Sequence, residues 1–222
     1  MPMFHKDSRG FYRVDDWDGF EWLDHGFGTR HVVLSGGFPQ LATLKQVHSA
    51  ECVAARGRTG VLGQGDGLLE NTPGALVAVK TADCLPILLV DPVARGVAAV
   101  HAGWRGTMAR IAAHAVAAMA TEFGARPERL RAAIGPGIGK CCFEVGPEVA
   151  AGFDEPVPGE GRRAHVDLAA ANRRQLLEAG VTASAIVASN LCTLCQPDEF
   201  ESYRRDREKA GRMYSYAGLR TL

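Results

Sequence analysis

Residues 75–106 read ALVAVKTADCLPILLVDPVARGVAAVHAGWRG, and their pattern predicts the central strands of the fold. Three apolar runs, at 75–80, 85–90 and 97–101, each have the length of a buried strand and are separated by turn residues. The short connection at 91–96 predicts that the second and third runs form an antiparallel hairpin. Because the two strands run about six residues in opposite directions, Cys84 and His101 are expected to lie at the same end of the hairpin.

The rest of the chain predicts further strands and two longer helices. Residues 1–22 are expected to pair at a sheet edge or to lie across the core, and His48 is expected within a strand at 44–53. Other strands are predicted at 25–30, 130–134, 185–188 and 213–219, a turn at 36–39, a short helix at 148–153, and longer helices at 107–123 and 168–178. Because no linker or repeat interrupts residues 1–222, we predict a single α/β domain with mixed, largely antiparallel sheets flanked by helices.

Composition excludes several classes of protein. The 222 residues contain 25 Lys and Arg against 25 Asp and Glu, so no overall charge attracts nucleic acid or an anionic membrane. The N-terminal residues lack the apolar core of a secretory signal, and the apolar runs are too short to cross a bilayer. We therefore expect a cytoplasmic protein whose six cysteines are mainly thiols rather than disulfides.

His48, Cys84 and His101 form the leading candidate for a metal site. Two imidazoles and one thiolate suit a borderline-soft cation such as Zn²⁺, and Cu²⁺ is a second possibility. Three protein ligands leave one coordination position for water or substrate, which is typical of a catalytic site. Their spacing is too long for a zinc finger, so the fold must bring them together.

Several short motifs occur in an order that closely resembles the YfiH/PgeF family. Members of this family have been called laccase-like polyphenol oxidases, purine nucleoside phosphorylases and peptidoglycan editing factors. The similarity runs from about residue 25 to residue 218. It rests on Lys45-Gln-Val-His48, Gly65-Asp-Gly67, Thr81-Ala-Asp-Cys84, His101-Ala-Gly-Trp-Arg-Gly106, Ile134-Gly-Pro-Gly-Ile-Gly139 and Cys142-Phe-Glu-Val-Gly146.

The resemblance implies a metal site, usually zinc, with His48, Cys84 and His101 as ligands on a layered α/β fold. It also implies phosphorolysis of adenosine, inosine, guanosine and S-methyl-5'-thioadenosine, together with deamination of adenosine. The expected partners are therefore purine nucleosides and phosphate. The chain departs from the family in a shortened segment at 30–45, which leaves one wall of the pocket undefined, and in Glu201, where a second aromatic residue is common.

Five further residues are candidates for substrate binding or proton transfer. Arg105, supported by Arg30 and Lys45, would contact phosphate, although a surface salt bridge is an equal alternative for Arg105. Asp83 would orient a ligand or accept a proton, or it would cap a turn. Gln46 would hydrogen-bond the purine edge, or its amide would bond to neighbouring backbone.

Two reactions follow from these assignments. In deamination, zinc would lower the pKa of a bound water for attack on adenine C6, with Asp83 moving the proton. In phosphorolysis, positive charge develops on the ribose and negative charge on the departing purine. Arg105 would hold phosphate in line for that step.

Three rival functions remain open at this stage. A copper-dependent polyphenol oxidase would use the same three ligands, with Met108 as the nearest methionine for an axial position. A cysteine hydrolase acting on peptidoglycan precursors would use Cys84 as nucleophile and His101 as base. A non-catalytic purine-sensing or cell-wall-associated protein would use the pocket without turnover.

The other cysteines give weaker signals. Cys192 and Cys195 form a C-x-x-C motif, but no second motif of this kind or histidine pair of finger spacing accompanies it. The adjacent Cys141 and Cys142 also lack an evident partner. We therefore expect both pairs to be ordinary structural thiols. The glycine-rich stretch 135–139 is expected to be a tight turn beside the pocket rather than a nucleotide-binding loop.

Overall fold

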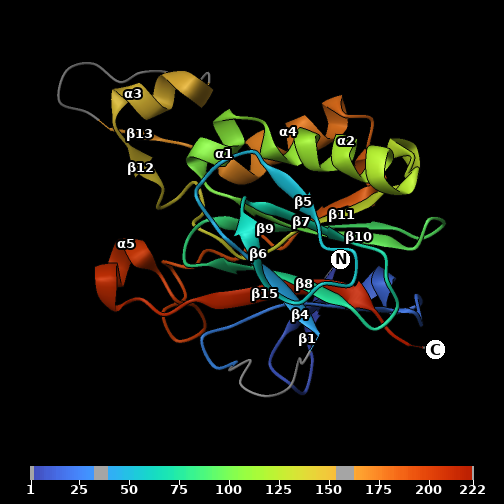
Figure 1. The fold of residues 1–222 in the computed structure, drawn as a ribbon. Helices are drawn as coiled ribbons and strands as arrows, with labels where there is room; N and C mark the ends of the chain where they lie inside the picture. The colour runs from blue at the N-terminus through green and yellow to red at the C-terminus, as the bar shows by residue number, and fades with distance from the viewer. Residues whose placement is uncertain (1–2, 33–39, 154–162, 222) are drawn as a thin grey trace.

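The computed structural model describes residues 3–32, 40–153 and 163–221, which form three layers. A seven-stranded sheet packs on a six-stranded sheet, and helices α2 (Ile111–Phe123) and α4 (Leu168–Glu178) cover the other face of the six-stranded sheet (Figure 1). Most strand pairs are antiparallel, so the predicted fold class is confirmed. The predicted turn at 36–39 and the middle of the shortened 30–45 segment lie outside the described residues.

The seven-stranded sheet begins with the N-terminal residues at one edge, as predicted. The C-terminal strand enters its middle and pairs with two strands from the N-terminal half of the chain. In spatial order the sheet contains β1 (Phe4–Lys6), β2 (Tyr12–Val14), β3 (Leu23–Phe27), β15 (Met213–Leu219), β8 (Leu76–Thr81), β4 (Leu41–Lys45) and β6 (Gly60–Gln64).

The six-stranded sheet contains the predicted hairpin and is the central layer. Successive residues of β9 point to opposite faces, so Leu88 packs against the other sheet and Leu89 against the helices. Burial on both faces explains why the sequence of this hairpin is almost continuously apolar. In spatial order the strands are β14 (Ile186–Ala188), β11 (Arg131–Ile134), β9 (Leu85–Asp91), β10 (Gly96–Ala102), β7 (Gly67–Glu70) and β5 (Cys52–Ala54).

Short elements connect and flank these layers. Asp167 caps α4 by accepting a hydrogen bond from the Ala170 N–H at 2.9 Å. Within the described part of the chain, no helix combines the length and apolar character needed to cross a membrane. The remaining elements are β12 (Glu144–Val145), β13 (Ala164–His165), α1 (Trp104–Met108), α3 (Pro147–Ala150), α5 (Tyr203–Asp206), η1 (Asp15–Trp17), η2 (Pro127–Arg129), η3 (Ala151–Phe153), η4 (Ala183–Ala185) and η5 (Arg207–Lys209).

The predicted continuous helix at 107–123 is wrong at its N-terminus. The chain forms α1, then breaks at Arg110, whose φ of 63° is left-handed, before α2 begins. Two side chains of α4 stabilise the break: Asn172 donates to the Thr107 hydroxyl at 2.9 Å and Gln175 donates to the Thr107 carbonyl at 2.6 Å. The longer helix, α2, therefore begins at Ile111, ten residues after His101, and not at residue 107 as predicted.

A buried histidine makes the stability of this fold dependent on pH. His25 is fully buried in β3, and its Nε2 accepts a hydrogen bond from the Val14 N–H at 3.0 Å. Burial lowers the pKa of His25 to about 3, and the Arg13 guanidinium acts in the same direction. Below the ordinary pKa of about 6.5 the unfolded chain takes up a proton that the folded protein excludes, so stability falls as the pH falls towards 3.

The variant His25→Gln removes this titration. Between pH 6.5 and pH 5, the free energy of unfolding of the parent protein should fall about 2 kcal/mol further than that of the variant. Denaturant titrations of both proteins at the two pH values measure this difference, and the other titrating groups cancel. Equal changes in the two proteins would contradict the assignment.

Candidate metal centre and its pocket

The hairpin brings Cys84 and His101 together as predicted. Cys84 lies in the turn between β8 and β9, and His101 is the penultimate residue of β10. The strand register pairs His101 with Pro86 and Ala102 with Leu85. Cys84 therefore lies one residue beyond the paired end of the hairpin, beside the histidine.

His48 reaches the same place from a loop, and the prediction of a strand at 44–53 is wrong. Strand β4 ends at Lys45, and His48 adopts a left-handed φ of 60°. The buried carboxylate of Asp66 accepts hydrogen bonds from the N–H groups of Val47, His48 and Ser49 at 3.2, 3.1 and 2.6 Å. These three N–H groups bind the carboxylate instead of a strand partner, which offsets the cost of the left-handed residue.

The three side chains could hold a metal ion. One ligand atom each from His48, Cys84 and His101 lies within 4.8 Å of the others. The Nδ1 of His101 lies 2.7 Å from Asp66 Oδ1, an arrangement that fixes the ring and leaves Nε2 for a ligand. A Cβ atom at Gly103 would lie 2.9 Å from Cys84 Sγ, so the glycine keeps space beside the sulfur. The donor set of two nitrogens and one sulfur fits zinc or copper.

The electrostatics of the centre favour a thiolate at Cys84. Desolvation raises the pKa of Cys84, but hydrogen bonds with His101 and His48 outweigh it and lower the pKa to about 6. Desolvation lowers the pKa of His101, whereas its bonds to Asp66 and Cys84 raise it to about 9. Asp66 itself has a pKa of about 2, because its bonds to His101 and Ser49 outweigh the desolvation that raises it. The lowered pKa of Cys84 makes its sulfur available as a negatively charged ligand for a cation.

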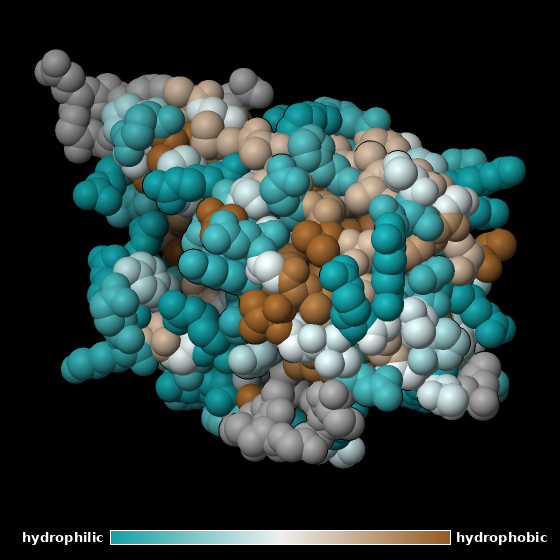
Figure 2. All heavy atoms as spheres, in the orientation of Figure 1, coloured by the Kyte–Doolittle hydropathy of each residue, from teal (hydrophilic) through white to brown (hydrophobic). Residues whose placement is uncertain are grey.

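The centre opens into a cavity of about 800 Å³. In Figure 2 the surface is hollowed between the lobe of β12, β13 and α3 and the segment of α5, with mainly hydrophilic residues around it. Apolar and aromatic side chains also contribute to the wall. Besides the three candidate ligands, the lining consists of Lys45, Gln46, Lys80, Ala82, Asp83, Trp104, Arg105, Ile138, Phe143, Tyr203, Arg204, Arg207, Glu208 and Arg212.

Several cations in this cavity are available to an anionic ligand. Among the described residues, Lys45, Lys80 and Arg105 have no carboxylate partner within ion-pair distance. The guanidinium of Arg105 lies 4.1 Å above the Trp104 ring, which fixes its orientation. Arg204 in α5, together with Arg207 and Arg212, forms a further basic wall of the cavity. We did not anticipate this basic wall, because the sequence of the segment has the charge pattern of an ordinary protein surface.

Two of the predicted substrate contacts are corrected by the structure. Gln46 lines the cavity, but its amide bonds the backbone of Lys80, donating to the carbonyl at 2.7 Å and accepting from the N–H at 2.8 Å. The alternative of a backbone contact is therefore the one observed. Arg30 does not line this cavity: it donates to the Pro197 carbonyl and lies 3.7 Å from Glu201, in a separate depression. The bend after β3 turns it towards those residues.

Asp83 lines the cavity, but its carboxylate makes structural contacts. One oxygen accepts from the Thr193 hydroxyl at 2.7 Å and the other from the Arg204 N–H at 2.6 Å. Asp83 is thus the residue that attaches the basic wall to the turn carrying Cys84. The contact predicted between an aspartate and a metal-ligating side chain is made by Asp66 instead, which we did not identify from the Gly65-Asp-Gly67 motif.

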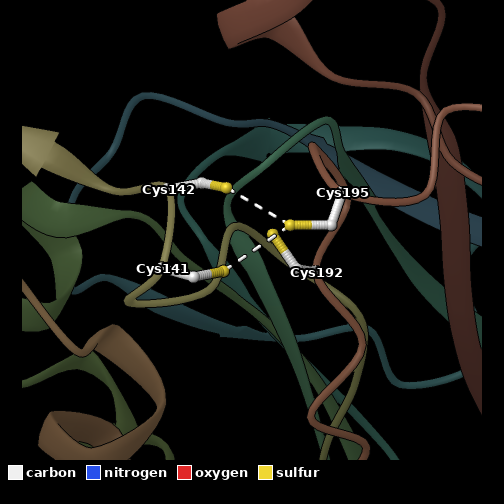
Figure 3. Close-up of side chains that lie close together, drawn as sticks. All are labelled: Cys141, Cys142, Cys192 and Cys195. Atoms are coloured by element: carbon white, nitrogen blue, oxygen red, sulfur yellow. Dashed lines mark hydrogen bonds between the residues drawn. The ribbon is translucent and has the colours of Figure 1, made fainter.

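The prediction that the remaining cysteine pairs lack partners is wrong. Cys141 and Cys142 meet Cys192 and Cys195 across two loops, and their four sulfur atoms lie within 4.8 Å of one another (Figure 3). The pairs are separated by about fifty residues, so neither motif alone indicates the other. The turn at 135–139, which comes just before Cys141 and Cys142, does pass the pocket as predicted, since Ile138 lines the pocket.

The copper hypothesis receives limited support from the side chains. All seven histidines lie in the described ranges, and only His48 and His101 belong to a group of candidate metal ligands there. Met108 is 43% exposed, packs near Gly152 and does not line the cavity. The histidines needed for a multicopper cluster are therefore not assembled among the described residues.

Comparisons with known proteins identify relatives of this chain. Residues 29–220 match a family model described as "Multi-copper polyphenol oxidoreductase laccase". The chain is 45% identical over 183 residues to a purine nucleoside phosphorylase of Deinococcus radiodurans, with 80% of this chain and 70% of the relative covered. It is 44% identical over 160 residues to adenosine deaminase RL5 from an unknown prokaryotic organism, with 68% and 60% covered. This chain therefore spans about three fifths of that second relative's length.

A solved structure has the same architecture along nearly the whole chain. It is titled as the hypothetical protein YfiH of Bacillus licheniformis, with a TM-score of 0.87 and 27% sequence identity. The superposition covers 99% of this chain and 100% of the other.

Proposed function

Because this chain belongs to the YfiH family, whose family model is described as multi-copper polyphenol oxidoreductase laccase, we propose that it is a purine nucleoside phosphorylase. The observation that carries the proposal is the cavity in which the three candidate metal ligands lie beside Lys45, Lys80 and Arg105. Adenosine, inosine, guanosine and S-methyl-5'-thioadenosine are the proposed substrates, in a cytoplasmic protein with no nucleic-acid or membrane partner.

Residues of the cavity have distinct parts in this proposal. Lys45, Lys80 and Arg105 would bind phosphate and hold it in line with the ribose carbon that it attacks. Trp104 and Phe143 offer aromatic surface to the purine. The bond between ribose and base breaks as the phosphate oxygen bonds to the ribose carbon, and the departing base carries the electron pair. His48, Cys84 and His101 would hold zinc, which supplies a Lewis acid at the end of the cavity.

Deamination of adenosine is a second proposed activity. Its support is the similarity to adenosine deaminase RL5 and the open, three-ligand centre, which leaves a coordination position for a reactant. A cysteine hydrolase is an alternative for the same residues, because the Cys84 and His101 side chains are hydrogen-bonded and Cys84 has a lowered pKa. His48 would have no part in that reaction.

Assays of the purified protein with inosine test the main proposal. We expect hypoxanthine and ribose 1-phosphate to form only when phosphate is present. Arg105→Ala should raise the KM for phosphate about 10- to 100-fold, because this change corresponds to the free energy of one charge-assisted hydrogen bond. Arg95→Ala removes an exposed arginine at the opposite end of β10 and should leave the KM unchanged.

Other outcomes would favour the rivals. Adenosine converted to inosine without phosphate would indicate deamination alone. Oxidation of phenols that requires stoichiometric copper would indicate a polyphenol oxidase. Hydrolytic activity of a metal-free protein, abolished by alkylation of Cys84, would indicate a cysteine hydrolase.

A further inference from the structure

Four cysteines lie together outside the centre described above, on two turns that are tied to each other. Cys141 and Cys142 lie on a turn closed by the Phe143 N–H donating to the Gly139 carbonyl at 2.9 Å. Cys192 and Cys195 lie on a second turn, closed by the Gln196 N–H donating to the Cys192 carbonyl at 3.2 Å. The turns are joined where the Thr193 N–H donates to the Gly137 carbonyl at 3.0 Å.

The sulfur atoms point into a common space between these turns (Figure 3). Cys195 Sγ lies 3.6 Å from Cys141 Sγ and 3.3 Å from Cys142 Sγ, and all four sulfurs lie within 4.8 Å of one another. A tetrahedral zinc ion with Zn–S distances of about 2.3 Å holds its sulfurs about 3.8 Å apart. The Gly139 N–H donates to Cys192 Sγ at 3.3 Å, a contact that stabilises a thiolate ligand. Small shifts of the exposed Cys141 and Cys195 would complete the tetrahedron.

We propose that Cys141, Cys142, Cys192 and Cys195 bind one zinc ion in a closed tetrathiolate site. Four protein ligands fill the coordination of zinc, so this site is structural, whereas the three-ligand centre is open. Binding converts four thiols to thiolates and releases their protons to solvent, with no change of oxidation state. The two exposed cysteines give the ion a route from solvent.

The proposed ion would fix one wall of the cavity. Ile138 and Phe143 line the cavity and lie just before and just after the loop that carries Cys141 and Cys142. On the other turn, Thr193 binds the carboxylate of Asp83, beside Cys84. The tetrathiolate site therefore holds together two loops that both contact the pocket.

Metal analysis of the Cys84→Ala variant tests the proposal separately from the function of the open centre. The untagged protein is expressed with added zinc, freed of excess metal under reducing conditions, and analysed for zinc per chain. We expect about one tightly bound ion in this variant. Adding Cys192→Ser and Cys195→Ser should reduce zinc to below about a tenth of an ion per chain. Adding Cys52→Ala, at a cysteine outside both groups, should leave the zinc unchanged.

Cobalt replacement identifies the ligands. Cys84→Ala loaded with Co²⁺ should show sulfur-to-metal charge-transfer bands and the intense visible bands of tetrahedral tetrathiolate cobalt, and the serine variants should lose them. If the serine variants do not fold, thiol titration of folded Cys84→Ala should release zinc as four thiols react. The proposal would be overturned if the Cys84→Ala variant contained no metal, or if its cobalt form lacked the sulfur-to-cobalt bands. It would also be overturned if the protein purified under these reducing conditions contained disulfides, which lower the mass by two hydrogens each.

Discussion

The Cys84→Ala variant should lose the metal of the three-ligand centre and about 10³-fold in kcat/KM for phosphorolysis. The substitution removes the thiolate ligand and leaves only two imidazoles, which bind a divalent cation much more weakly. A Lewis acid contributes several kcal/mol to the stabilisation of a charged transition state, and about 4 kcal/mol corresponds to this loss. Steady-state kinetics together with metal analysis measures both effects, with Cys52→Ala as the control.

Cys84→Asp separates a metal ligand from a nucleophile at this position. A carboxylate is an accepted zinc ligand, so this variant should recover part of the metal binding and activity lost in Cys84→Ala. Full activity of Cys84→Ala would exclude any role for the thiolate. Complete inactivity of Cys84→Asp with its metal still bound would instead favour the nucleophile.

Asp66→Asn should weaken metal binding or activity about 10- to 100-fold and also lower stability by about 3 kcal/mol. The carboxylate contacts His101 Nδ1 and accepts N–H bonds from the loop carrying His48, so it positions two of the three candidate ligands. An amide has only one acceptor oxygen, and its NH₂ group would face buried donors.

Chelator competition measures the metal affinity of this variant, and denaturant titration measures its stability. Asp16→Asn, at an exposed aspartate of η1, is the matched control and should change neither. A stability loss with unchanged metal affinity would show that Asp66 supports the fold without positioning the ligands.

The sequence predicted the structure best where a local pattern of apolar residues and turns also determines which strands pair. The hairpin of β9 and β10 is predictable because its apolar runs and short turn determine the pairing, which places Cys84 beside His101. The prediction of a strand around His48 failed because the left-handed backbone there depends on Asp66, which is distant in sequence. No local pattern contains that contact.

The basic wall and the cysteine cluster were also inaccessible to local reasoning. The segment containing Arg204 is strongly charged and would ordinarily be assigned to the solvated surface. It reaches the cavity because its backbone binds Asp83, more than a hundred residues earlier. The two cysteine pairs likewise meet through contacts between residues far apart in sequence, such as those of Gly137 and Gly139 with the other turn.

Two of the three candidate ligands lie where the chain passes from one sheet to the other. His48 follows β4 of the seven-stranded sheet and precedes β5 of the six-stranded sheet, and Cys84 lies between β8 and β9 in the same way. A metal ion bound there would cross-link the two sheets. Sliding of the sheets would move these ligands apart, so we expect buried side chains between the sheets, such as Leu88, to influence how tightly the ion is held.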